Sequence, residues 1–171
     1  MTRSPGPTNH SIGFQFVRAS DLSSRAIGWF GGGYYSHVDC VLSDGRLLGA
    51  RSDAVGGQKP GVRIRQQDYE VWQRRTLIRI AVTAYQYCEW MRFLEAQLGK
   101  PYDRTAIWAF ALDRDWREQD SWICSELASR SIEMALGLEL ALPVNKIDPG
   151  ACSLVASALG KVVEDQLLRA A

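Results

Sequence analysis

Residues 36–53 read SHVDCVLSDGRLLGARSD, and this stretch decides how the chain folds. Two apolar runs flank a Ser-Asp-Gly tripeptide, a pattern typical of a β-hairpin. Two registers are open to it. A two-residue Asp-Gly turn pairs Ser43 with Arg46, whereas a three-residue loop with Gly45 in the left-handed conformation pairs Leu42 with Arg46.

The three-residue loop is favoured because it separates the two faces of the hairpin. One face then carries Val38, Cys40, Leu42, Leu48 and Ala50, and the other carries His37, Asp39, Gly49, Arg51 and Asp53. A slip of one residue would mix the two sets, since successive side chains on a strand point to opposite faces. The sequence therefore predicts a hairpin with an apolar core face and a polar face that bears a histidine.

Further strands and helices surround this hairpin. Alternating apolar residues predict strands at 12–19, 62–65 and 76–82, and helical patterns predict helices at 21–30, 84–98, 105–112, 121–136 and 150–159. Thr83 and Gln86 form a capping box before the second of these helices. Gly137 is expected to end the fourth, and Asp148 followed by Pro149 is expected to open the last. Because strands mostly precede helices, we expect an α+β fold with an antiparallel sheet, in one domain over residues 12–171 after a flexible tail at 1–11.

The bulk composition excludes several function classes. The chain has 171 residues, of which 46% are hydrophobic and 23% charged, and its net charge of +1 gives no general attraction to nucleic acid. The N-terminus lacks the apolar run of a signal peptide, and no apolar stretch reaches the length of a membrane span. We therefore expect a protein made in the cytoplasm, with no nucleic-acid partner and no integral membrane segment.

Cysteine and histidine usage argues against a metal centre. The four cysteines are scattered with no CxxC spacing, and the chain has only two histidines. A structural zinc site needs four such ligands at close spacing. We expect neither a metal nor another cofactor.

Cys124 is the candidate nucleophile. It is expected about three residues into the helix of SWICSELASRS, with Ser121 or Asp120 as the cap. First-turn N–H groups and the helix dipole stabilise an anion there, which lowers a thiol pKa. The alternative interpretation is a small buried hydrophobic residue, the usual role of a free cysteine.

Two further residues are candidates for the same site. His37, expected in mid-strand on the polar face, is held rigidly enough to act as a base; the alternative is a surface or packed histidine. Tyr102, in the segment LGKPYD, has a hydroxyl that can serve an oxyanion; the alternative is a loop tyrosine packed on the core.

Three segments together resemble a known family. YYSHVDCVLSDGRLLGA, LGKPYD and SWICSELASRS occur in the order found in permuted papain-like amidases of the YiiX type, relatives of NlpC-type peptidoglycan peptidases and of the lecithin–retinol acyltransferase group. The resemblance covers roughly residues 12–137. It implies a circularly permuted papain-like fold in which histidine precedes cysteine, with Cys124 as nucleophile, His37 as base, and an amide, ester or thioester as substrate.

One position departs from the family pattern. Members usually carry a third polar residue, histidine or glutamate, on the second hairpin strand, and that slot here is Gly49. Asp39 lies opposite Gly49 and can accept the imidazole N–H in its place. The alternatives for the third group are Asp53, a backbone carbonyl, or none.

Three functions follow as expectations. The first is a cysteine hydrolase that cleaves an amide, such as a peptidoglycan peptide, or an ester. The second is a non-catalytic binding or structural module on the same fold, and the third is a lipid acyltransferase or thioesterase. The chain also resembles small proteins encoded in bacteriophage and prophage tail regions, which implies phage tail proteins as partners and a place in the virion.

Overall fold

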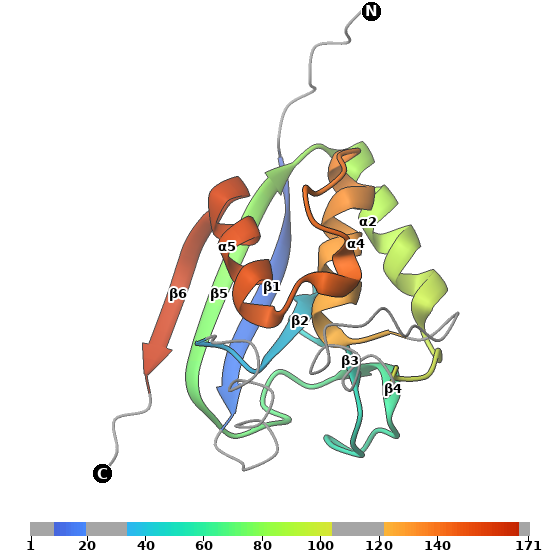
Figure 1. Ribbon diagram of the computed structural model, residues 1–171, viewed down its shortest axis with the longest axis vertical. Coiled ribbons are helices and arrows are strands. Elements are labelled where there is room, and N and C mark those ends of the chain that lie inside the picture. The colour runs from blue at the N-terminus through green and yellow to red at the C-terminus, as the bar shows by residue number, and fades with distance from the viewer. Residues whose placement is uncertain (1–8, 20–33, 104–121, 168–171) are drawn as a thin grey trace, which may run out of the picture.

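The computed structural model describes residues 9–19, 34–103 and 122–167 and has a mixed α+β fold, as predicted (Figure 1). Within these residues a six-stranded antiparallel sheet has the order β4-β3-β2-β1-β5-β6. The strands are β1 (His10–Ala19), β2 (His37–Val41), β3 (Leu47–Arg51), β4 (Gly61–Arg65), β5 (Trp72–Val82) and β6 (Lys161–Leu167). The helices are α2 (Ala84–Gln97), α4 (Cys124–Leu136) and α5 (Pro149–Leu159), with a short 3₁₀ turn at Val144–Lys146.

The helices cover one face of the sheet. Helix α4 packs on β2 and β3, α2 packs on β1 and on α4, and α5 packs on β5, β6 and β1. The core between the layers includes Phe14, Phe16, Ile78, Ile80, Trp90, Leu94, Leu127 and Ile132. Burial of these large side chains supplies the main stabilisation of the fold and fixes α4 over the predicted hairpin.

Local signals place several helix ends where the sequence predicts them. Thr83 and Gln86 form the capping box at the start of α2. Gly137 ends α4 with a left-handed φ of 64°, a conformation that glycine adopts without a steric penalty. The Asp148 side chain accepts from the N–H of Ala151, and Pro149 is the first residue of α5.

Other boundaries differ from the predictions. Strand β1 begins at His10, inside the predicted tail. Strand β6 follows the last helix and was not predicted, because its side chains are mostly exposed and show no apolar alternation. The predicted helices 21–30 and 105–112 lie outside the described residues, and no helix within the described residues is long and apolar enough to cross a membrane.

Helix α4 begins later than expected, at Cys124, which makes the cysteine its first residue. Its N-cap is Ile123, and no side chain caps the helix, so the prediction of Ser121 or Asp120 as the cap is wrong. The physical reason is the preceding pairing: the N–H of Trp122 donates to Pro101 O at 3.1 Å, and Trp122 O accepts from the N–H of Asp103 at 3.1 Å. This extended backbone forms a bridge with Tyr102, so the helix starts only after it.

Candidate active site

The hairpin adopts the register with the three-residue loop. Cys40 pairs with Leu48, the N–H of Leu42 donates to Arg46 O at 2.8 Å, and Gly45 has a φ of 83°. The side chains of the predicted apolar face, Val38, Cys40, Leu42, Leu48 and Ala50, all join the core. Both the register and the division of the two faces are confirmed.

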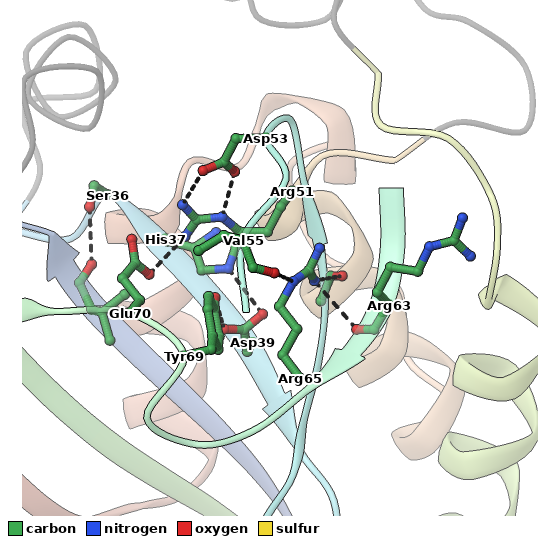
Figure 2. A network of polar contacts seen from close by, with 12 residues as sticks. Ser36, His37, Asp39, Arg51, Asp53, Val55, Arg63, Arg65, Tyr69 and Glu70 are labelled. Carbon is green, nitrogen blue, oxygen red and sulfur yellow. Dashed lines mark hydrogen bonds and ion pairs between the residues drawn. The ribbon is translucent and has the colours of Figure 1, made fainter. Parts of the chain in front are cut away.

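His37 and Asp39 form a buried pair on the polar face of β2. The His37 ring Nε2 lies 3.0 Å from Asp39 Oδ1, and the two residues are only 6% and 2% exposed. His37 is the first residue of β2 rather than a mid-strand residue. The second oxygen, Oδ2, accepts a 2.8 Å hydrogen bond from the hydroxyl of Tyr69 (Figure 2). Both oxygens of the Asp39 carboxylate are therefore engaged.

Gly49 explains how Asp39 fits into this position. A β-carbon at residue 49 would lie 1.7 Å from Asp39 Oδ1, which is far too short for two atoms that are not bonded. The carboxylate thus occupies the space where a side chain at 49 would begin. The position on β3 at which we expected a third polar residue is therefore a glycine, and an acid from β2 fills the space beside it.

Asp53, the alternative third residue, is bound elsewhere. Its two carboxylate oxygens accept from Arg51 Nε and Nη2 at 2.9 and 3.1 Å. Arg51 also donates to Glu70 at 2.7 Å. This bidentate ion pair directs the Asp53 carboxylate to Arg51. Asp39 is the acid that contacts the His37 ring.

Cys124, the first residue of α4, is buried near His37. The Cys124 thiol lies close enough to His37 for the charge and hydrogen-bonding capacity of the imidazole to lower its pKa, and the backbone of Val38 acts in the same direction. Because Nε2 faces Asp39, Nδ1 is the ring nitrogen that is left for the sulfur. His37 and Val38, the first two residues of β2, therefore both act on the proposed nucleophile.

The electrostatics of the pair favour a thiolate and an imidazolium. Burial alone raises the pKa of Cys124, but the charge and hydrogen bond of His37 and the N–H of Val38 lower it below the usual thiol value. Burial alone lowers the pKa of His37, but the charges of Asp39 and Cys124 and their hydrogen bonds raise it to about 10. The two directions agree, since each charged partner stabilises the other.

The other buried thiols have the opposite tendency. Burial raises the pKa of Cys40 well above the usual thiol range, and burial raises the pKa of Cys152 to about 12. Cys88 is exposed on α2. Of the three buried thiols, Cys124 is the one whose pKa is lowered, and His37 is the neighbour that lowers it.

Tyr102 lies close to the nucleophile: its backbone forms the bridge with Trp122, two residues before Cys124, and the charge of Cys124 acts on its hydroxyl. Burial and the charge of Cys124 raise the pKa of the Tyr102 hydroxyl above its usual range. The hydroxyl therefore keeps its proton and can donate a hydrogen bond. The structure brings all four predicted residues, Cys124, His37, Asp39 and Tyr102, to one place.

Tyr69, Glu70 and Arg65 also belong to this region and were missed by sequence reasoning. The first two lie in the loop between β4 and β5, and Arg65 ends β4. The loop sequence QQDYEV has no periodicity, and its neighbours in space come from β2 and β3, so no local signal marks it.

Comparison with known proteins shows a likeness at the level of the fold. No family model matches the chain, and no curated protein matches its sequence closely enough to be a relative. Among solved structures, the chain is similar to YiiX from Escherichia coli O157:H7, which is described as a metalloprotein. The TM-score is 0.62 at 16% identity, over 94% of this chain and 99% of that one. The two chains share a YiiX-like fold.

Proposed function

We propose that this chain is a cysteine hydrolase with a circularly permuted papain-like fold, in which Cys124 is the nucleophile, His37 the acid and base, and Asp39 the residue that orients the imidazole. The observation that carries the proposal is the buried His37–Asp39 pair, with buried Cys124 near enough that the thiol and the imidazole each shift the pKa of the other. A thiolate next to an imidazolium, with an acid on the far ring nitrogen, is the arrangement that nucleophilic catalysis by cysteine needs.

The first half-reaction forms an acyl-enzyme. The Cys124 thiolate attacks the carbonyl carbon of an amide or ester, and the carbonyl electron pair moves to the oxygen. The tetrahedral intermediate then collapses, the bond to the leaving group breaks, and His37 gives its Nδ1 proton to the departing amine or alcohol. Asp39 keeps the ring oriented and stabilises its charge before the transfer.

The second half-reaction regenerates the thiolate. Neutral His37 takes a proton from water, the resulting hydroxide attacks the thioester carbonyl, and collapse releases a carboxylic acid and the Cys124 thiolate. In both halves the oxyanion forms next to the first turn of α4, whose backbone N–H groups point toward it. The Tyr102 hydroxyl is a second donor on this side.

A non-catalytic module on the same fold is the competing function. Its support in the sequence was the empty slot at Gly49, and Asp39 now occupies that space. The buried, charged pair also argues for chemistry, since burying a charge without a function is costly. Substrate class, acyl transfer to lipid and association with phage tails remain predictions.

The metal of the YiiX structure is not carried over to this chain. In the described part of the chain, no group of three histidine, cysteine, aspartate or glutamate side chains is arranged to hold a metal ion. The residues therefore do not fit such a site, and no step of the proposed reaction uses one.

The test is hydrolysis of nitrophenyl esters, peptide anilides and muropeptides by the wild type and two single variants. We expect Cys124→Ala and His37→Ala each to lose on the order of 10³-fold or more in kcat, and the double variant to be no worse, because the two residues act as one unit. Cys88→Ser, which changes an exposed thiol, is the matched control and retains full activity. Wild-type protein inactive on all three substrate classes would favour the binding module.

A further inference from the structure

We propose that Tyr69 is a positioning residue for this reaction: its hydroxyl holds Asp39 in the orientation that receives the His37 ring, and Arg65 in turn fixes Tyr69. The inference rests on the proposed function, which assigns Asp39 its orienting task. It adds residues from a loop that neither the sequence motifs nor the likeness to YiiX assigns.

The contact geometry defines one orientation of the carboxylate. His37 Nε2 lies 3.0 Å from Oδ1, and the Tyr69 hydroxyl donates to Oδ2 at 2.8 Å. Two donors on two different oxygens fix both the plane and the rotation of the group. Without the tyrosine, Asp39 would keep one hydrogen bond and gain freedom to turn.

Asp39 needs this external support because of Gly49. In the family pattern, the third residue projects from β3 across the hairpin. Here the acid comes from the same strand as the histidine, two residues away, and β3 contributes only a glycine at the facing position. Position 49 therefore offers no side chain to support the carboxylate, and Tyr69 from the loop after β4 supplies a hydrogen-bond donor instead (Figure 2).

Arg65 anchors the tyrosine. It is 2% exposed, and its guanidinium donates to backbone carbonyls of Gly49 at 3.2 Å and of Val55 and Lys59 at 3.4 Å each. The same guanidinium lies 5.6 Å from the centre of the Tyr69 ring, within range of a cation–π contact. One buried cation thus ties β3, the 55–59 loop and the tyrosine together.

The 55–59 loop packs against the base of the Tyr69 side chain. Gly56 has a φ of 60°, and a β-carbon there would lie 2.7 Å from the Cβ of Tyr69. Only glycine satisfies both the left-handed backbone and this close approach. Arg51 contributes a second guanidinium at 5.6 Å from the ring centre. The phenol is held on several sides with its hydroxyl directed at Asp39.

The protonation states agree with this role. Burial and the charge of Asp39 raise the pKa of Tyr69 above its usual range, so the hydroxyl remains a donor. Burial alone raises the pKa of Asp39, but His37, the Tyr69 hydrogen bond and Arg51 lower it below its usual value. Arg65, Cys40 and Cys124 are the other titratable groups that act on this carboxylate.

The decisive variant is Tyr69→Phe, which removes one oxygen and keeps the ring between the two guanidinium groups. We expect kcat to fall about tenfold with KM nearly unchanged, since loss of orientation affects the transition state more than ground-state binding. The acid titration of the Asp39 carboxyl carbon, followed by NMR, should move to higher pH because a stabilising donor is lost. Tyr85→Phe, on an exposed tyrosine, is the control and changes neither quantity.

Coupling to Asp39 separates positioning from simple packing. In an Asp39→Asn background, Tyr69→Phe should lower kcat by less than about twofold, because the group it positions is already disabled. A similar loss in both backgrounds, or an unchanged Asp39 titration, would overturn the proposal. The titration needs no substrate. It therefore tests the contact between Tyr69 and Asp39 even if the wild-type protein has no hydrolase activity.

Discussion

The two faces of the β2–β3 hairpin are built in different ways. On the apolar face, Cys40 and Leu48 pack under α4 in contacts that the alternation of the sequence predicts. On the polar face, His37 and Asp39 are just as well buried, but their partners come from α4 and from the loop that carries Tyr69. The apolar face is maintained by exclusion of water, and the polar face by a few directed hydrogen bonds. Mutations should therefore separate stability from chemistry.

The largest expected effect is on the polar face. Asp39→Asn should lower kcat by about 10²-fold or more, by analogy with the loss of the orienting acid in other triads. Because the charge of Asp39 raises the pKa of His37, its removal should lower that pKa from about 10 and move the alkaline limb of the kcat/KM profile to lower pH.

The matched control for this variant is Asp53→Asn. Its carboxylate is bound by Arg51, so kcat should stay within about threefold of wild type, below the size expected of an orienting acid. An Asp39→Asn enzyme that also stays in this range would remove Asp39 from catalysis.

On the apolar face, Leu48→Ala should cost about 2–5 kcal/mol of the free energy of unfolding, because it leaves a cavity in a site that is 1% exposed. Denaturant unfolding measures the loss. Leu154→Ala, at a residue 73% exposed, is the control and should cost little. If Leu48→Ala, assayed while folded, lost as much activity as Asp39→Asn, the two faces would not be separable.

Gly49→Ala tests how far the two faces are independent, because it adds one carbon on β3 in the space of the Asp39 carboxylate, the proposed orienting group. The new β-carbon would occupy the position of Asp39 Oδ1. We expect kcat to fall about tenfold or more, with a stability loss of about 1–3 kcal/mol from overpacking. Steady-state kinetics and thermal unfolding check the two parts. Unchanged kinetics would show that Asp39 can work from a second orientation.

The smallest effect concerns thiol reactivity. With limiting iodoacetamide at a pH of about 6.5, Cys124 should label about fivefold faster than exposed Cys88, because its lowered pKa leaves more thiolate although its burial limits access. Peptide mapping by mass spectrometry gives the ratio. Faster labelling of any other cysteine in the folded protein would argue against the nucleophile assignment.

The parts of the site that the sequence predicts are those carried by short-range patterns. The S-D-G loop sets the hairpin register, and the register alone places Asp39 opposite Gly49. Tyr69 could not be predicted in the same way, since its contact with Asp39 spans thirty residues and depends on how the loop after β4 returns over the sheet. The start of α4 was placed too early because the Tyr102–Trp122 bridge is also non-local.

Strand β6 shows the same limit in the fold. Its pairing with β5 is accompanied by cross-strand ion pairs, in which Arg74 contacts Asp165 and Arg75 contacts Glu164. Charged pairs of this kind stabilise a sheet edge but leave no apolar alternation in the sequence. The pattern that identifies half-buried strands therefore does not detect this one.

The Asp39 carboxylate occupies the space where a side chain at position 49 would begin. The two side chains therefore cannot both be present in this arrangement. In the proposed mechanism, the orienting group can come from position 39 on β2 or from position 49 on β3. A change from one to the other must first lose the side chain at one position before a side chain can be added at the other. Glycine at 49 is the permissive step, because it opens the space without occupying it. Under the proposed function, an orienting acid on β2 therefore requires a glycine at the facing position of β3.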